Sequence, residues 1–301
     1  MLKTIGYVGW RIWFFFRASF FWLVSLFTKK SVPGDQGAWE WVQHNSIDEP
    51  KLIENEVIEG SLQVRQSNIT FRGCTFKGDV RILGPARNGE SEFLRNESKK
   101  RGYVNWLRRQ CPTNVRFENC RIEATGKTIP LYIAPGVTKT FVKNTKITGK
   151  SSSVMVYLDA ESHGNTFEDC DIDGTYAGRE TIAIDASDHN TFRRCRITFK
   201  KEAAMLLYRN CGLKGTTRHT TPSFNIIDDN EFVRKGMSDI AVHVGSRRGG
   251  RLYCCQDKGY EVGSSASDRD HARFNDVSNN RLNGCRILES CGHSNVIKGN
   301  V

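Results

Sequence analysis

The chain has 301 residues, and its 44 Lys and Arg outnumber 33 Asp and Glu, which gives a formal net charge of +11. This length holds one long domain plus an appendage, and the positive balance favours anionic partners such as acidic polysaccharides, lipid headgroups or nucleic acids. The sequence carries no helix-turn-helix, zinc-finger or RNA-binding motif, so we expect no nucleic-acid partner.

Residues 1–30 are predicted to form a hydrophobic, amphipathic helix that associates with a membrane surface. The segment is rich in Trp and Phe, but Arg11 and Arg17 interrupt it. The uninterrupted apolar run of ten residues, Ala18–Phe27, is shorter than the roughly 20 residues that span a bilayer. An interfacial helix, a tilted transmembrane anchor and a signal peptide remain open, and the lack of a small-residue cleavage site favours a retained anchor. We therefore expect a membrane-associated protein of a bacterial cell envelope.

Residues 31–51 have the composition of a linker followed by a short N-terminal cap, and a repeat begins after them. Its phrase is Asn, a β-former, Phe, two polar residues, Cys or Asn, one polar residue, and Ile or Phe. It starts at Asn68, Asn114, Asn165 and Asn190, with weaker copies from Asn225, Asn275 and Asn295. The steps between these Asn residues are 46, 51, 25, 35, 50 and 20 residues.

These steps fit a solenoid, because one turn of a parallel β-helix takes about 25 residues. Each phrase therefore marks one rung, and the doubled steps conceal either an insertion or a degenerate rung, such as the one at Thr140–Ile147. Alternation along a strand puts the Phe, Cys and Ile of each phrase on one inward face. We accordingly expect a buried ladder of free thiols at Cys74, Cys120, Cys170 and Cys195, since free Cys behaves as a small hydrophobe.

The repeat resembles the right-handed parallel β-helix proteins of the pectin-lyase-like superfamily, over residues 52–301. The resemblance implies an all-β, right-handed parallel β-helix; a β-sandwich, the rival fold, has no reason to repeat at constant pitch. That superfamily includes lyases, hydrolases, epimerases, phage tailspikes and inert stalks, so the fold alone does not imply a function. The motifs of polygalacturonases and the Asp-Pro-His-Asp motif of mannuronan epimerases do not occur in this sequence.

A second set of strands carries polar side chains that point away from the core. Alignment by hand places Asp159, Asp185, Tyr208 and His243 at nearly one register in successive rungs, about 5 Å apart. We take these four residues as the candidate catalytic set. The candidate substrate-binding residues are Tyr132, Tyr157, Arg209, Arg247, Arg248, Tyr260 and Arg269.

Carboxylates, a phenol, an imidazole and guanidinium groups in one groove are what polysaccharide chemistry requires. An Arg neutralises a uronate carboxylate, and His243 or Tyr208 would then remove the C5 proton in a lyase or an epimerase. Alternatively, Asp159 and Asp185 form the carboxylate pair of a hydrolase, and a separation of about 5 Å would fit retention of configuration.

Two insertions interrupt the repeat, at 84–112 and 245–272. The first is basic and predicted to be helical over Ser91–Gln110. It is either a solvated helix packed on the solenoid or an anion-binding or membrane-apposed patch, with Tyr103 and Trp106 as stacking surfaces. The second leaves the strand of His243 and is positioned to fold over the polar column. No paired Cys-x-x-Cys motif and no EF-hand loop occurs, so we expect neither a metal nor another cofactor.

Two functions remain open at this point. The protein acts on an acidic polysaccharide as a lyase, epimerase or hydrolase, or it is a non-catalytic structural or glycan-binding solenoid in a cell-envelope or phage-related assembly. The last phrase ends at Asn300–Val301 without a visible cap. Open solenoid ends normally need covering. Truncation, an assembly partner at this end and another closure of the last rung remain open.

Overall fold

The computed structural model describes residues 39–41, 49–84, 96–98, 100, 102–126, 128–209, 218–245, 272–290 and 292–301. The predicted membrane helix at 1–30 lies outside these ranges, as does most of the second insertion. Among the described residues, no helix is both long enough and apolar enough to cross a membrane.

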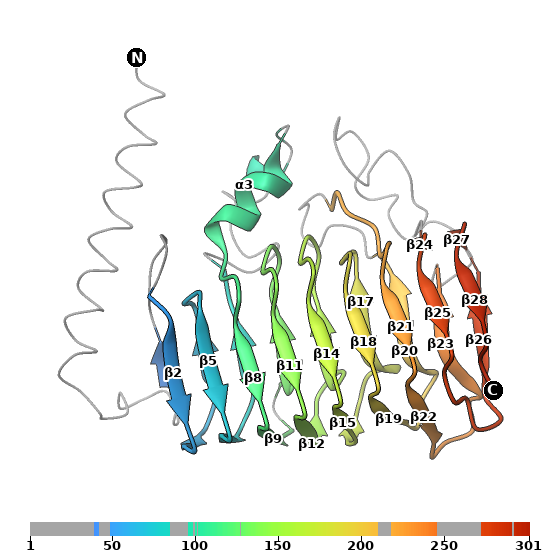
Figure 1. Ribbon diagram of the computed structural model, residues 1–301, viewed down its shortest axis with the longest axis horizontal. Helices are drawn as coiled ribbons and strands as arrows, with labels where there is room; N and C mark the ends of the chain where they lie inside the picture. The colour runs from blue at the N-terminus through green and yellow to red at the C-terminus, as the bar shows by residue number, and fades with distance from the viewer. Residues whose placement is uncertain are drawn as a thin grey trace.

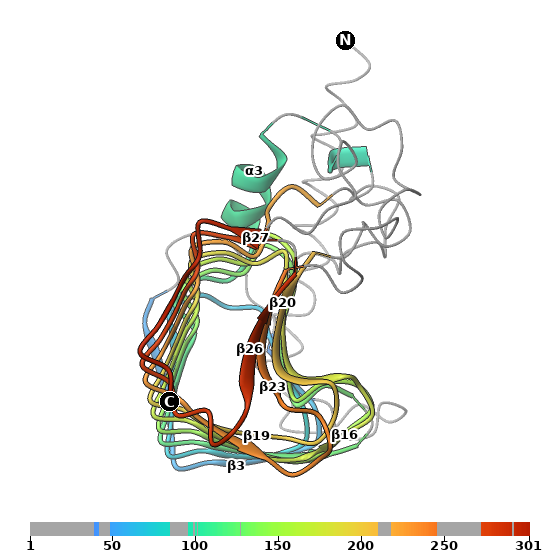
Figure 2. The same ribbon diagram turned by 90° about the vertical axis from the view of Figure 1, so that its right-hand side faces the viewer.

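The described strands build a parallel β-helix of three sheets, as the repeat predicts. Seen along its axis, the chain winds around a core enclosed by the three sheets (Figure 2), and the rungs stack side by side along the long dimension (Figure 1). We name the sheets A, B and C. Nearly every pairing joins equivalent strands of successive rungs in parallel.

Sheet A has nine strands and carries the predicted polar column. It consists of β1 (Trp39–Trp41), β4 (Leu62–Val64), β7 (Val80–Ile82), β10 (Leu131–Ile133), β13 (Val156–Leu158), β17 (Glu180–Asp185), β20 (Ala203–Tyr208), β23 (Ile240–Val244) and β26 (Arg286–Glu289). Its first strand comes from the segment predicted as linker and cap, since Trp39–Trp41 pairs in register with Leu62–Val64.

Sheets B and C hold the two halves of each repeated phrase. Sheet B consists of β2 (Lys51–Glu54), β5 (Ile69–Arg72), β8 (Arg116–Glu118), β11 (Phe141–Lys143), β14 (Thr166–Glu168), β18 (Thr191–Arg193), β21 (Ile226–Asp228), β25 (Asp276–Ser278) and β28 (Val296–Lys298). Sheet C consists of β3 (Val57–Glu59), β6 (Thr75–Lys77), β9 (Arg121–Thr125), β12 (Lys146–Ser151), β15 (Asp171–Ile172), β19 (Arg196–Phe199) and β22 (Glu231–Arg234), and β16 (Thr175–Tyr176) also pairs with β12. A short extra pair joins β24 (Ala272–Arg273) to β27 (Gly292–His293).

The strand pairings explain the irregular steps between the Asn residues. β5 pairs directly with β8, so the 46-residue step is one rung plus the first insertion. The degenerate rung is confirmed as β11, which pairs with both β8 and β14. β21 pairs directly with β25 across the 50-residue step, which holds the second insertion. The 35-residue step between β18 and β21 holds a shorter excursion that the sequence analysis did not identify.

The inward face has the predicted composition. The rings of Phe71 and Phe117 stack at 5.2 Å and those of Phe167 and Phe192 at 4.5 Å. The four predicted ladder cysteines are buried free thiols, and burial raises the pKa of Cys120 to about 11. Stacking identical side chains at the rung spacing fills the core without voids, which is what close packing requires.

The Asn residues of the phrase play two roles, and only one was predicted. Asn68 and Asn114 occupy left-handed bends with φ near 55°, as expected for Asn. In later rungs the residue before Asn takes the left-handed conformation, and Asn points inward instead. There the side-chain amide donates to the next rung's Asn at 2.8–3.0 Å, in a ladder of Asn165, Asn190, Asn225, Asn275 and Asn295.

The first insertion contributes helix α3 (Tyr103–Gln110), which lies outside the solenoid at one corner (Figure 2). It falls within the predicted helical stretch. Tyr103 is buried, and its ring lies 5.4 Å from that of His219 and 6.0 Å from that of Trp106. The helix packs on the solenoid through Tyr103 and Leu107, as the first alternative predicted. Tyr103 therefore offers no open stacking surface.

Candidate active site on sheet A

The outer face of sheet A contains two adjacent rows of side chains, not one column. Leu158 pairs with Ile184, so Asp159 and Asp185 follow opposite each other, and Asp185 pairs with Tyr208. His243 pairs instead with Leu206.

His243 therefore belongs to the row of Tyr132, Tyr157, Ala183 and Leu206. The expected common register is wrong for this residue because β23 is aligned two positions further along. The side chains of two rungs, Ala183 and Leu206, separate His243 from Tyr157. Successive rungs are about 4.8 Å apart, so the imidazole does not reach the two carboxylates through this row.

The expected open groove is also absent among the described residues. Asp185 is fully buried, and Tyr208, Arg209 and Asp159 are 2%, 4% and 7% exposed. Tyr208 packs in a small apolar cluster on the outer face of sheet A, together with Val154, Ala183 and Leu206. These side chains point away from the solenoid core but are covered from outside, so the site is a buried polar network.

A single guanidinium joins the two carboxylates. Nη1 of Arg218 lies 3.0 Å from Oδ1 of Asp159 and 3.0 Å from Oδ2 of Asp185, so these two oxygens are no further apart than twice that distance. The Arg218 side chain is only 4% exposed. Burial alone would lower the pKa of Arg218, but the carboxylates of Asp185 and Asp159 outweigh it and raise that pKa.

Tyrosines from the preceding rung complete the network. The Tyr132 hydroxyl donates to Oδ2 of Asp159 at 2.6 Å, and the Tyr157 hydroxyl donates to Oδ2 of Asp185. Burial raises the pKa of both phenols well above the usual range, and the neighbouring aspartates raise it further. Burial also raises the pKa of Asp159, against the opposing charge of Arg218 and with the help of Asp185.

The segment 218–220 is held over the network by the turn that follows β13. Both carboxylate oxygens of Glu161 accept hydrogen bonds from the backbone, at 2.7 Å from His219 N and 3.2 Å from Thr220 N. The His219 ring contacts the backbone oxygen of Ser98 at 2.6 Å and packs on Tyr103. The 218–220 segment thus contacts the first insertion through His219, while Arg218 is buried against the two carboxylates of sheet A.

The remaining predicted residues lie apart from this network or outside the described ranges. Nε2 of His243 contacts the Ser290 hydroxyl at 2.7 Å, and burial lowers the pKa of His243. Its Nδ1 is buried with no hydrogen-bond partner among the described residues. Arg247, Arg248, Tyr260 and Arg269 are outside the described residues.

The profile of the family described as "Right handed beta helix region" matches residues 63–242. This chain belongs to that right-handed β-helix family. A search of curated proteins found no match.

Two solved structures are similar to this chain. The A-module of the Azotobacter vinelandii mannuronan C-5 epimerase AlgE6 is 14% identical with a TM-score of 0.45, and the match covers 64% of this chain and 48% of that one. The chain therefore spans about half the length of that module. The plasmid-mediated fluoroquinolone-resistance protein QnrB1 is 9% identical with a TM-score of 0.27, and the match covers 84% of this chain and 91% of that one.

In this right-handed β-helix, the residue that sequence reasoning missed is Arg218. It lies in the excursion between β20 and β21, outside every repeated phrase. The usable signal was the 35-residue step from Asn190 to Asn225, against 25 residues from Asn165 to Asn190. The longer step indicates an excursion next to Tyr208, but nothing in the sequence tells over which face of the solenoid the excursion folds.

Proposed function

We propose that this protein binds an acidic polysaccharide along the outer face of sheet A and hydrolyses it at the Asp159–Asp185 pair. The carrying observation is the guanidinium of Arg218, which holds the two carboxylates close together while a tyrosine hydroxyl contacts each of them. Retaining glycosidases use two carboxyl groups about 5–5.5 Å apart, and inverting ones about 6.5–9.5 Å. The upper limit set by Arg218 favours the shorter class.

The two carboxyl groups differ in surroundings, as the two roles require. Asp159 is the candidate general acid, because burial raises its pKa and it is the more accessible of the two. Asp185, which faces Arg218 and the Tyr157 hydroxyl, is the candidate nucleophile. Substrate access to Asp185 requires the 218–220 segment to move aside. Elimination and C5 epimerisation have less support, because His243 lies in another row and Tyr208, the other candidate base, is buried in an apolar cluster.

The neighbouring row supplies a surface for the polysaccharide chain. Gln63, Arg81, Tyr132 and Tyr157 follow one another in register, one per rung. The Arg81 guanidinium lies over the Tyr132 ring, 5.2 Å from its centroid. A guanidinium suits the carboxylate of an acidic sugar, and a phenol offers both an apolar face and a polar tip. The buried Nε of Arg218 has no hydrogen-bond partner among the described residues, and a ligand oxygen would satisfy it.

A second candidate function is glycan binding without chemistry, and the complete burial of Asp185 favours it. In that case the ion pairs of Arg218 serve to fasten the 218–220 segment to the solenoid. The row of Arg81, Tyr132 and Tyr157, in which Arg81 and Tyr157 are half-buried and Tyr132 is buried, then carries the binding alone.

The experiment is incubation of the full chain with a panel of polyuronates. New reducing ends report hydrolysis, absorbance of unsaturated uronates reports elimination, and proton exchange at C5 reports epimerisation. Hydrolysis that Asp159→Asn lowers by about 10²–10⁴-fold supports the proposal. Asp228→Asn, which changes an ion-paired carboxylate on the outer face of sheet B, should leave the rate unchanged.

Binding is measured separately by retention on immobilised polyuronate. Arg81→Ala should weaken retention, whereas Arg116→Ala should not, although Arg116 stacks on Phe141 of sheet B in a similar way at 4.3 Å. Retention without turnover selects the binding solenoid. Neither turnover nor retention on any polyuronate overturns both candidates.

The location is part of the same proposal. Residues 1–30 would hold the solenoid at the membrane surface of a bacterial cell envelope, and a partner would cover the C-terminal rung, where Val296 and Ile297 are 44% and 40% exposed. Cell fractionation of the full chain and of a chain lacking residues 1–30 tests the first point. Equal recovery of both in the membrane fraction would contradict it.

A further inference from the structure

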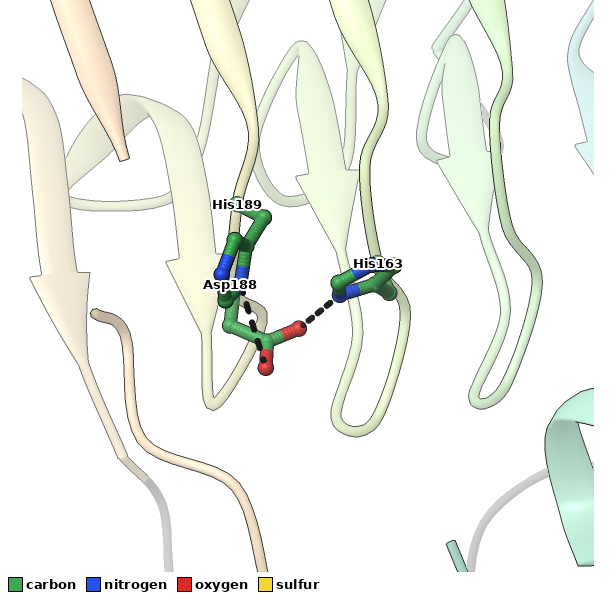
Figure 3. A group of neighbouring side chains, drawn as sticks. All are labelled: His163, Asp188 and His189. Carbon is green, nitrogen blue, oxygen red and sulfur yellow. Dashed lines mark hydrogen bonds and ion pairs between the residues drawn. The ribbon is translucent and has the colours of Figure 1, made fainter. Parts of the chain in front are cut away.

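A cluster of two histidines and one aspartate lies at the turns that connect sheet A to sheet B. His163 follows β13, and Asp188 and His189 follow β17 one rung later (Figure 3). One potential ligand atom from each of the three side chains lies within 4.8 Å of the other two. The Asp188 carboxylate sits between the rings, with Oδ1 2.7 Å from Nδ1 of His163 and Oδ2 3.6 Å from Nδ1 of His189.

The solenoid holds these side chains in place. His163 and Asp188 form a backbone bridge in the series Thr113, Thr138, His163, Asp188, so the rung spacing fixes their approach. His189 takes the left-handed φ of 56° that this turn position also has, within a few degrees, at Phe224 and Phe274, so the repeated bend fixes its backbone next to Asp188. A site on such a scaffold is more precise than one on a mobile loop.

An outer contact orients the carboxylate. Nη2 of Arg108, in α3, lies 2.8 Å from Oδ1 of Asp188, and its Nε donates to the backbone oxygen of Glu161 at 2.9 Å. Ligating carboxylates are commonly held by such outer partners. The arginine occupies Oδ1, which leaves Oδ2 directed toward His189.

The donor set defines the class of ion. Imidazole nitrogens with one carboxylate suit zinc and neighbouring transition metals, whereas calcium and magnesium prefer oxygen ligands throughout. Ligand atoms lie about 2.0–2.2 Å from zinc. The ligand atoms of the three side chains lie within 4.8 Å of one another, so rotation of the side chains would bring them to one ion. The side chains of His163 and His189 are 32% and 50% exposed, which leaves room for the rotation and for water at the open positions.

The cluster is not a by-product of rung stacking. In the rung before His163, the equivalent residue is Thr138. In the rung after Asp188 it is Ser223, whose backbone oxygen accepts a hydrogen bond from His189 N. The His189 ring stacks on Phe224 at 4.8 Å, and Phe224 on Phe274 at 5.0 Å. The three potential ligands thus lie in two successive rungs, and the flanking rungs carry Thr138, Ser223 and Phe224 at the equivalent positions.

We propose that His163, Asp188 and His189 form a solvent-open binding site for a divalent transition metal of the zinc class.

The test is titration of the full-length, metal-stripped chain with zinc chloride by calorimetry, beside His163→Ala/His189→Ala, Asp188→Asn and the control His293→Ala. His293 is an exposed histidine further along the same edge. The chain has ten cysteines, and thiols also bind zinc. The zinc bound at the proposed site is therefore the difference in stoichiometry between the parent and the variants. The double variant should lose one equivalent, Asp188→Asn should bind at least about tenfold more weakly, and His293→Ala should bind as the parent does.

A second readout is independent of stoichiometry. The electron paramagnetic resonance spectrum of bound Cu²⁺ should show two nitrogen ligands in the parent and one in His189→Ala, a half-exposed position whose substitution the fold should tolerate. Circular dichroism of the metal-free variants establishes that they are folded. Equal zinc binding by the parent and the double variant, or no saturable binding at all, overturns the proposal.

Discussion

Charged side chains lie at the surface on the outer faces of sheets B and C, but two carboxylates are buried on the outer face of sheet A. On sheet B, and on sheet C from Lys146 to Glu231, charges alternate in sign from rung to rung and stay at the surface. On sheet C, Arg196 lies between Asp171 at 3.5 Å and Glu231 at 3.6 Å, and all three side chains are 35–45% exposed. On sheet A, two carboxylates and one guanidinium are less than 10% exposed.

This difference distinguishes the exposed ion pairs, which help to align the rungs, from the buried network, which indicates a site. An alternating surface ladder favours correct stacking of the rungs, but exposed pairs contribute little individually. Buried charges are costly to desolvate and are kept only when they are paired. A buried, paired network on one outer face is therefore the part of this solenoid that stacking alone does not require, and perturbed carboxyl groups in such places are candidates for function.

The largest effect is expected from removing the cation of sheet A. Arg218→Met leaves Asp159 and Asp185 buried without their counter-charge, and should destabilise the protein by about 3–5 kcal/mol. Arg193→Met on sheet B, which breaks a partly exposed pair with Asp228 at 3.1 Å, should cost at most about 1 kcal/mol. Urea denaturation monitored by circular dichroism compares the two. Equal losses would remove the distinction between the faces.

A smaller loss is expected from the hydroxyl that contacts Asp185. Tyr157→Phe removes a buried hydrogen-bond donor while keeping the ring, and should cost about 1–3 kcal/mol. Thr191→Val, on the outer face of sheet B, should stay within about 0.5 kcal/mol. The same denaturation curves give both values, and a neutral Tyr157→Phe would mean that Asp185 does not depend on this contact.

Asp159 on sheet A and Asp169, at the turn between β14 and β15, should respond oppositely to pH. Burial raises the pKa of Asp159, so its contribution to stability is present below its unfolded pKa of about 3.9 and is lost as the pH rises through the folded pKa. The hydrogen bond from Arg194 lowers the pKa of Asp169, so that contribution is lost as the pH falls.

Denaturation midpoints from about pH 3 to about pH 7 are measured for the parent, Asp159→Asn and Asp169→Asn. The difference between the parent and Asp159→Asn should shrink as the pH rises above about 4. The difference for Asp169→Asn should shrink as the pH drops below about 4. Parallel trends would contradict the assignment of opposite shifts.

The smallest effect belongs to the surface ladder. Arg196→Ala should change stability by less than about 1 kcal/mol, and the change should diminish further in about 1 M salt, where the Debye length is about 3 Å. Thermal melts at low and high salt measure it. A loss that salt leaves intact would indicate that the ladder acts through packing rather than charge.

The repeat determined the solenoid and its interior. Phe71, Cys120 and Ile172 face inward because side chains alternate across a strand, and the period of the phrase sets which strands stack. These are local rules, so they can be read from the order of residues. The phrase also hid one distinction, since Asn68 takes a left-handed bend whereas Asn190 points into an internal amide ladder.

The candidate sites were decided by tertiary structure. Asp159 and Asp185 were expected on the same row, but Arg218 reaches them from an excursion outside the repeat. His163 meets Asp188 only because 25 residues make one rung. His243 left the expected row because β23 aligns two positions further along. Strand register and loop direction depend on contacts between distant segments, and neither residue order nor local propensity encodes those contacts directly.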